Sequence, residues 1–144
     1  MTDENRRTRV ALIEDNPADV YLVREALRVR NLPCELIVIP TFEAAIELVQ
    51  SGSLPRPDAF MIDLNLRTGS GLEILDAIRR DEGLRKAAVA ILTSSDSPRD
   101  RAAADQLGAN FYIRKPSELD SFLNEVGDAI AALTGGSQQC AAAN

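Results

Sequence analysis

Five short apolar segments recur along the chain and set its architecture. They are "VALI" (10–13), "LIVI" (36–39), "AFMI" (59–62), "AVAIL" (88–92) and "FYI" (111–113). None shows the strict alternation of apolar and polar residues that marks a strand with one solvent-exposed face. A continuous apolar run of this length is typical of a strand covered on both faces. We therefore predict five buried strands in a parallel sheet.

Helix signals fall between the strands. Asn16 precedes Pro17, and Thr41 begins a segment that Gly52 ends, so both are predicted N-caps. Three further starts place a hydroxyl residue three positions before an acid, the capping-box pattern: Ser70 with Glu73, Ser97 with Asp100, and Ser117 with Asp120. Gly108 is predicted to close the fourth helix.

Each predicted helix has an apolar face at spacings of three and four. The predicted inward residues are Val20, Val23 and Leu27; Ala45, Ile46 and Val49; Leu75 and Ile78; Ala103 and Leu107; and Leu119, Phe122, Val126, Ile130 and Leu133. The order is therefore (βα)₅, an α/β fold in which right-handed crossovers place helices on both faces of one open sheet. The polar, glycine-rich "TGGSQQCAAAN" that follows is predicted to fray.

Composition favours one soluble domain. The chain has 144 residues, of which 45% are hydrophobic and 26% charged, and its net charge of -6 disfavours binding to nucleic acid or anionic membranes despite the basic "NRRTR" at 5–9. No apolar run approaches the ~18 residues of a membrane span, and the N-terminus lacks the order of a signal peptide. These features predict a cytoplasmic protein.

The residue types present restrict the chemistry. There is no histidine, and the two cysteines, Cys34 and Cys140, form no disulfide framework. A zinc site and histidine-based nucleophilic catalysis are therefore excluded as working hypotheses. Carboxylates, hydroxyls and lysine remain.

Polar residues follow four of the five predicted strands. They are Glu14 and Asp15, Asp63, Thr93 with Ser94 and Ser95, and Lys115. Singly, each has an ordinary structural explanation as a cap, a turn residue or a solvated lysine. Carboxyl ends of parallel strands share one edge, however, and three close carboxylates repel one another unless a cation such as Mg²⁺ intervenes. An aspartate beside such an ion, a lysine and a hydroxyl makes a phosphoryl-transfer site with Asp63 as nucleophile.

Four motifs give the chain a family resemblance. "LIEDN" (12–16), "MIDLNL" (61–66), "ILTSS" (91–95) and "YIRKP" (112–116) occur in order, with Thr93 and Lys115 at 30 and 52 positions after Asp63. In these motifs the chain resembles the receiver domains of two-component response regulators. The resemblance implies a flavodoxin-like sheet of strand order 2-1-3-4-5, a receiver domain at 8–133, and flexible termini at 1–7 and 134–144.

The resemblance also implies roles for the site residues. Mg²⁺ or Mn²⁺ would be held by Glu14, Asp15, Asp63 and the backbone carbonyl of Asn65. A sensor histidine kinase or a histidine phosphotransfer protein would phosphorylate Asp63, and the chain would catalyse only its own aspartyl phosphorylation and dephosphorylation. The remaining implied roles are contact with the phosphoryl group for Thr93 and Lys115, a switch aromatic at Tyr112, and control of phosphate access by Asn65, Ser94 and Ser95.

The implied output is a change in the face formed by the fourth helix, fifth strand and fifth helix, which would bind an unnamed downstream protein or a second copy of the chain. No output module follows the fifth helix, so a single-domain regulator is expected. In the loop "SGSLPRP" (51–57) and the sequence "DLNL" (63–66), the chain resembles regulators that serve bacterial phytochrome-type kinases. Two residues depart from the family pattern: Arg67 replaces a common proline, and Glu14 replaces a common aspartate.

Three alternatives bear on this interpretation. A haloacid-dehalogenase phosphatase would need a second acid where Asn65 stands. A flavodoxin-like carrier of flavin mononucleotide would need a phosphate cradle where the acidic "EDNPAD" (14–19) lies. A receiver-like interaction module that works without phosphorylation remains open, although the phosphorylation set is complete.

Overall fold

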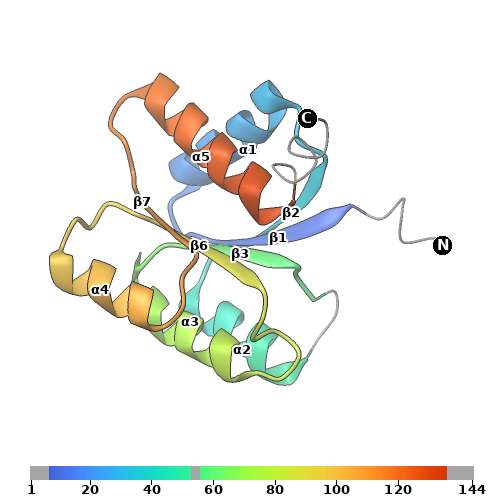
Figure 1. The fold of residues 1–144 in the computed structure, drawn as a ribbon, viewed down its shortest axis with the longest axis vertical. Helices are drawn as coiled ribbons and strands as arrows, with labels where there is room; N and C mark the ends of the chain where they lie inside the picture. The colour runs from blue at the N-terminus through green and yellow to red at the C-terminus, as the bar shows by residue number, and fades with distance from the viewer. Residues whose placement is uncertain (1–6, 53–55, 136–144) are drawn as a thin grey trace.

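Five parallel strands form one sheet in the computed structural model, which describes residues 7–52 and 56–135 (Figure 1). The strands are β1 (Thr8–Ile13), β2 (Cys34–Ile39), β3 (Ala59–Ile62), β6 (Ala88–Thr93) and β7 (Phe111–Arg114). Their spatial order is β2-β1-β3-β6-β7. Counted along the chain this is 2-1-3-4-5, so the predicted flavodoxin-like fold is confirmed.

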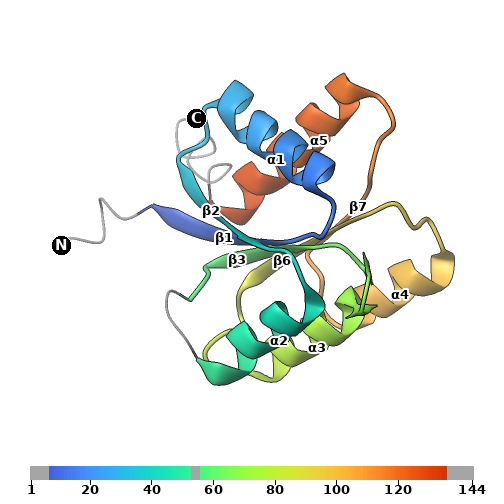
Figure 2. The same cartoon turned by 180° about the vertical axis from the view of Figure 1, so that it is seen from behind.

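Helices cover both faces of the sheet. One layer contains α1 (Pro17–Arg30) and α5 (Leu119–Leu133), and the other contains α2 (Phe42–Ser51), α3 (Gly71–Arg80) and α4 (Pro98–Gln106) (Figures 1 and 2). Side chains alternate along β1: Val10 and Leu12 pack in the α1/α5 core, whereas Ala11 and Ile13 pack in the α2/α3/α4 core. This explains why the inner strands read as continuous apolar runs.

The two edge strands depart from the prediction that all five are covered on both faces. In β7, Phe111 is 39% exposed and Arg114 is exposed, and β2 is only partly buried over its centre. An edge strand has a neighbouring strand on one side alone, so the helical layers that close over the centre leave it partly open.

Four of the five predicted helix caps are confirmed. The side-chain oxygens of Asn16, Thr41, Ser70 and Ser97 accept hydrogen bonds from backbone N–H groups in the first turns of α1, α2, α3 and α4. The prediction for Ser117 is wrong: α5 begins after Glu118 with no side-chain cap bond. Residues 117–120 are all exposed, so this first turn is not packed in the core. Leu119 is therefore 56% exposed instead of inward.

The remaining predicted inward faces are mostly confirmed. Phe122, Val126, Ile130 and Leu133 are buried in α5, but in α4 the buried residue is Ala104 and Ala103 is only half-buried. Gly52 and Gly108 follow α2 and α4 with φ of 72° and 87°, the left-handed conformation that glycine adopts at little cost.

A short hairpin follows β3 and was not expected from the sequence. In it β4 (Asn65–Leu66) pairs antiparallel with β5 (Gly69–Ser70), directly before α3. Gly69 lies against the ring of Phe42, where a side chain would overlap the ring. The hairpin therefore packs on the start of α2.

Some predictions fall outside the described residues. These are the behaviour of most of the two termini, including Cys140, and of the centre of the 51–57 loop. Among the helices in 7–52 and 56–135, none combines the length and apolarity that crossing a bilayer requires.

Gly71 tests the packing of α3 against the end of β3. A Cβ at this position would overlap the carbonyl oxygen of Asp63 and lie 2.9 Å from the Cα of Leu64. We expect Gly71→Ala to lower the free energy of unfolding by about 2 kcal/mol in urea denaturation, because backbone cannot move aside cheaply. In the control Gly83→Ala the nearest atom lies 3.4 Å away, so a loss as large as that of Gly71→Ala would contradict this explanation.

Candidate functional site

The carboxyl ends of the parallel strands gather the candidate residues at one edge of the sheet. Glu14 and Asp15 follow β1, Asp63 follows β3, Thr93 ends β6 and Lys115 follows β7. Glu14, Asp63 and Thr93 are polar yet 1%, 6% and 0% exposed. Buried polar groups need partners, so the contacts among these residues decide what the site can do.

Lys115 is the positive centre of the site. Its Nζ lies 3.0 Å from Asp63 Oδ2, 3.0 Å from Glu14 Oε1 and 2.6 Å from Asp19 Oδ2. Burial alone would lower the pKa of Lys115, but the hydrogen bond to Asp19 and the charges of Glu14 and Asp63 outweigh it and raise the pKa. The lysine therefore stays charged.

Asp19 was missed as a site residue by sequence reasoning. It belongs to the "EDNPAD" segment and lies in the first turn of α1, where an acid is easily explained as a partner of the helix dipole. The available signal was its place: Asp19 lies in the first turn of the helix that Pro17 opens, close in sequence to the acidic pair at the end of the first strand. Its salt bridge to Lys115 joins positions 96 residues apart.

Three carboxylates form a group that could hold a cation. Ligand oxygens of Glu14, Asp15 and Asp63 all lie within 4.8 Å of one another. Burial and the charge of Asp63 raise the pKa of Glu14 from 4.5 to about 7, against the opposing effect of Lys115. The buried Glu14 Oε1 has the ion pair with Lys115 but no hydrogen bond of good geometry.

The donor set fits a hard divalent ion. With Asp19, four carboxylates gather near one ammonium, which pairs with three of them, Glu14, Asp19 and Asp63. Their excess negative charge raises the free energy of the metal-free site. Mg²⁺ and Mn²⁺ prefer oxygen ligands of this kind.

Asn65 links the phosphoacceptor candidate to Thr93. Its backbone N–H donates to Asp63 Oδ1 at 3.0 Å, and its Nδ2 donates to Thr93 Oγ1 at 3.4 Å. Thr93 Oγ1 also accepts a bond from the backbone N–H of Ser95 at 3.3 Å. The predicted ligand role of the Asn65 carbonyl stays a prediction.

The two serines after β6 differ in exposure and in hydrogen bonding. Ser94 is exposed. The hydroxyl of Ser95 donates to Asp100 Oδ2 at 2.7 Å, in the first turn of α4. The Ser95 side chain thus fastens the β6–α4 loop to α4, and its predicted part in phosphate access stays a prediction.

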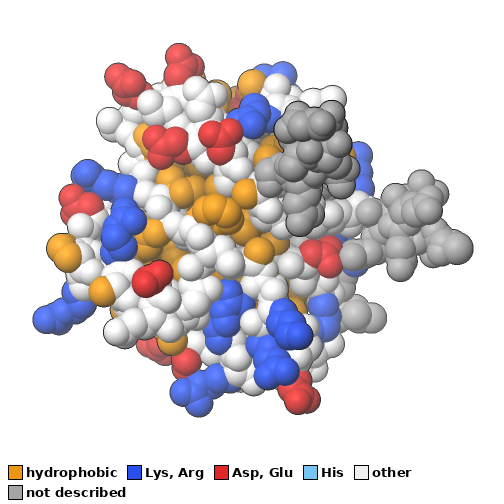
Figure 3. All heavy atoms as spheres, in the orientation of Figure 1, with side chains coloured by type: hydrophobic (Ala, Val, Ile, Leu, Met, Phe, Trp, Pro, Cys, Tyr) orange, Lys and Arg blue, Asp and Glu red, His pale blue; other side chains and the backbone are white. Residues whose placement is uncertain are grey.

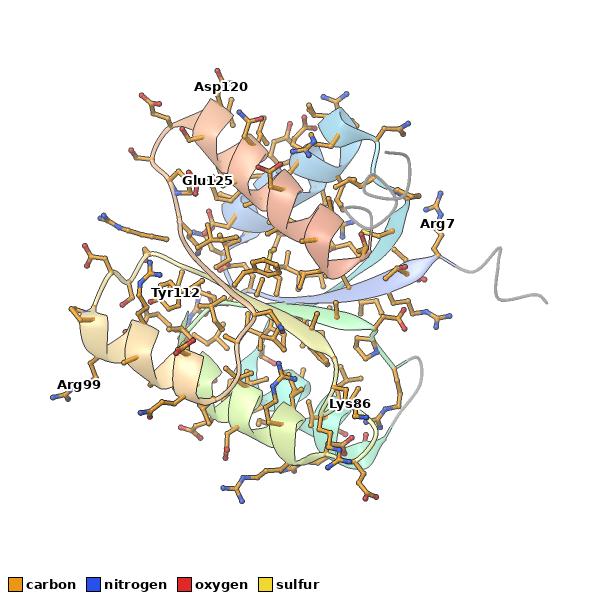
Figure 4. All side chains as sticks on the ribbon, in the orientation of Figure 1. Arg7, Lys86, Arg99, Tyr112, Asp120 and Glu125 are labelled. Carbon is orange, nitrogen blue, oxygen red and sulfur yellow. The ribbon has the colours of Figure 1, made fainter. Side chains whose placement is uncertain are left out.

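Tyr112 joins β7 to the same loop. Its hydroxyl donates to the backbone carbonyl of Ser95 at 3.1 Å, and the Arg101 guanidinium of α4 lies 4.4 Å from the ring centroid. Figure 4 shows Tyr112 beside α4. Two contacts therefore hold the ring, one at its edge and one on its face.

Comparison with known proteins identifies a family for this chain. The family model described as the response regulator receiver domain matches residues 10–127. Response regulator Rcp1 of Synechocystis sp. is 33% identical over 131 residues, which cover 88% of this chain and 89% of Rcp1.

Solved structures show the same fold. The phosphorylated cyanobacterial phytochrome response regulator RcpA aligns with a TM-score of 0.81 and 28% identity, over 89% of this chain and 94% of RcpA. The Mn²⁺-bound form of Rcp1 aligns with a TM-score of 0.79 and 31% identity, over 86% of this chain and 92% of the other. With its fold, its acidic cluster and these likenesses, the chain belongs to the response regulator receiver domain family of two-component signalling.

Proposed function

We propose that this protein is a single-domain response regulator that accepts a phosphoryl group on Asp63, in a reaction that depends on Mg²⁺ or Mn²⁺. The donor is a sensor histidine kinase or a histidine phosphotransfer protein of the cytoplasm. The observation that carries the proposal is the Lys115 ammonium 3.0 Å from Asp63 Oδ2, inside a cluster of acids that fits a divalent ion. The coverage of 89% of Rcp1 supports the single-domain assignment, and the likeness to RcpA supports a phytochrome-type kinase as donor.

The metal would be held by Glu14, Asp15 and Asp63, with the Asn65 carbonyl as a further ligand. The ion supplies positive charge that offsets the clustered carboxylates and the incoming phosphoryl oxygens. The description of a neighbour as the Mn²⁺-bound form of Rcp1 supports this assignment.

The transfer itself needs little rearrangement of Asp63. The Asn65 N–H and the Lys115 ammonium hold the two oxygens of its carboxylate, which fixes the nucleophile against rotation. One Asp63 oxygen attacks the phosphorus of a phosphohistidine; the new O–P bond forms as the P–N bond breaks, and the imidazole leaves with the electron pair. Lys115 then pairs with a phosphoryl oxygen.

Thr93 connects the modification to the output face. The Thr93 hydroxyl now accepts from Asn65 Nδ2 and the Ser95 N–H. A phosphoryl oxygen on Asp63 offers it a charged acceptor, so Thr93 donates to that oxygen and turns away from the Ser95 N–H. The loop that carries Ser95 shifts, and the bond between Tyr112 and the Ser95 carbonyl is broken. Tyr112 is then free to turn.

The face that would change lies over α4, β7 and α5. Figure 3 shows exposed apolar side chains between α4 and α5, with acidic side chains over α5 and both basic and acidic side chains around α4. A hollow of about 450 Å³ lies there, lined by Ala102, Ala109, Phe111 and Tyr112 among others. We propose that this face binds a downstream protein or a second copy, since its opposite charges are self-complementary across a two-fold axis.

Phosphorylation of Asp63 is tested by intact mass after incubation with Mg²⁺ and acetyl phosphate. We expect a gain of one phosphoryl group in the wild type and in Asp105→Asn, an exposed acid of α4. We expect no gain in Asp63→Asn or with excess chelator, because the nucleophile or the ion is removed. An unmodified wild type would favour the alternative, an interaction module that works without phosphorylation.

Glu14→Gln tests the cost of burying an ionised carboxyl in the cluster. The pKa of Glu14 is about 7 in the fold against 4.5 ordinarily, so protonation stabilises the fold fully below pH 4.5, and this stabilisation is lost as pH rises to about 7. Between about pH 5 and about pH 8, without metal, the stability of Glu14→Gln relative to wild type should rise by up to about 3 kcal/mol.

The same urea denaturation series contains its own control. Glu47→Gln changes an exposed acid of α2 and should track the wild type at every pH. Glu14→Gln should also lose most of the rise in Tm that Mg²⁺ produces. A stability difference between Glu14→Gln and wild type that is independent of pH would contradict the raised pKa.

Thr93→Val tests the link between site and face. With Mg²⁺ and beryllofluoride, hydrogen exchange in 98–106 and 111–114 should change in the wild type but not in Thr93→Val, which cannot donate to the phosphoryl mimic. Thr134→Val, at the end of α5, should respond like the wild type. If hydrogen exchange in Thr93→Val changed as much as in the wild type, with beryllofluoride binding verified by native mass, Thr93 would be excluded as the link between the site and this face.

A further inference from the structure

The turn of the β4–β5 hairpin contacts one of the candidate metal ligands. The backbone N–H of Arg67 donates to Asp15 Oδ2 at 2.8 Å, across 52 positions of sequence. Within the described residues Lys115 pairs with Glu14, Asp19 and Asp63 but not with Asp15. Asp15, which is only half-buried, is thus held by the hairpin and not by the lysine.

The hairpin itself is held from the other side by α2. Gly69 lies flat against the Phe42 ring, and Thr68 Oγ1 donates to Glu43 Oε1 at 2.9 Å. Both partners belong to the first turn of α2. These contacts fix the two residues that follow Arg67, and Leu66 before it is buried in the core, so the direction of the Arg67 N–H is set by packing.

We propose that the Arg67 backbone N–H is a positioning group that holds the Asp15 carboxylate ready for Mg²⁺, and that residue 67 thereby tunes metal affinity. The inference rests on the proposed Mg²⁺ site. Receiver domains commonly carry proline at this position, and proline has no N–H to donate. Arg67 thus gives this chain a hydrogen bond to its metal ligand that a proline there would abolish. Groups that orient a ligand in this way typically change metal affinity 10- to 100-fold when removed.

Proline is compatible with the backbone here. Residues 66–69 form the turn between the paired strands β4 and β5, with Arg67 in its second position and Gly69 in its fourth. Proline is favoured in that second position and glycine in that fourth one. Leu66 is in a strand, as a residue before proline prefers, and φ of Arg67 is not positive. The substitution therefore removes the hydrogen bond without forcing a new turn.

The decisive comparison is between Arg67→Pro and Arg67→Ala. Both remove the guanidinium charge, and only Arg67→Pro removes the N–H. Calorimetric titration of the full chain with Mg²⁺ should give an affinity for Arg67→Pro about 10-fold weaker than for Arg67→Ala. Arg67→Ala should bind at least as tightly as wild type, because a positive charge beside the cluster is gone.

The outcomes separate this inference from the function it rests on. A wild type that takes up no Mg²⁺ would overturn the proposed metal site. A wild type that binds Mg²⁺, with equal affinities for Arg67→Pro and Arg67→Ala, would overturn the role of the N–H alone.

A second measurement does not depend on the proline variant. In the wild type the amide proton of Arg67, in an exposed turn, should be protected from solvent exchange by NMR, and Asp15→Ala should remove that protection. An unprotected Arg67 amide in the wild type would overturn the inference whatever the stability of Arg67→Pro.

Discussion

The structure depends on one ammonium group surrounded by more negative charge than it can balance. Lys115 meets Glu14, Asp19 and Asp63 at 2.6 to 3.0 Å, and Asp15 adds a fourth carboxylate to the same edge. The parallel sheet makes this arrangement unavoidable, because it delivers the ends of β1, β3 and β7 to one place. Close carboxylates repel one another until a cation offsets their charge, which is why this cluster fits the proposed divalent ion.

The two-layered core keeps the site in place. β1 and β3 bury every side chain of their central stretches, so the carboxylates that follow them start from fixed points. Gly71 brings the start of α3 against the backbone of Asp63, and the Asn65 N–H fixes the carboxylate from the other side. The Asp63 carboxylate, the proposed nucleophile, is thus held by the backbone on both sides, which is what positioning requires.

Local signals and the meeting of strand ends at one edge could be predicted from the sequence, and individual contacts between distant side chains could not. Continuous apolar runs predicted the strands, and hydroxyl or amide caps predicted four helix starts, because both effects act within a few residues. The predicted strand ends placed the three acids, Thr93 and Lys115 at one edge of the sheet, where the structure has them. Ser117 failed as a cap because α5 begins one residue later, after Glu118, which makes no side-chain cap bond. The Asp19 salt bridge was missed because its partner lies 96 positions away, and the hairpin because its two-residue strands are too short to give an apolar pattern.

The salt bridge between Lys115 and Asp19 has a consequence for how the two helical layers are coupled. Asp19 belongs to α1, in the layer opposite α4, whereas Thr93 leads through Ser95 to α4 and Tyr112. Lys115 is therefore a counter-ion shared between the site and the α1/α5 layer. In the proposed function, a phosphoryl group on Asp63 draws Lys115 toward it, so that Asp19 loses its partner and the charge balance at the start of α1 changes together with the loop before α4. The proposed event at the sheet edge would in this way reach both helical layers.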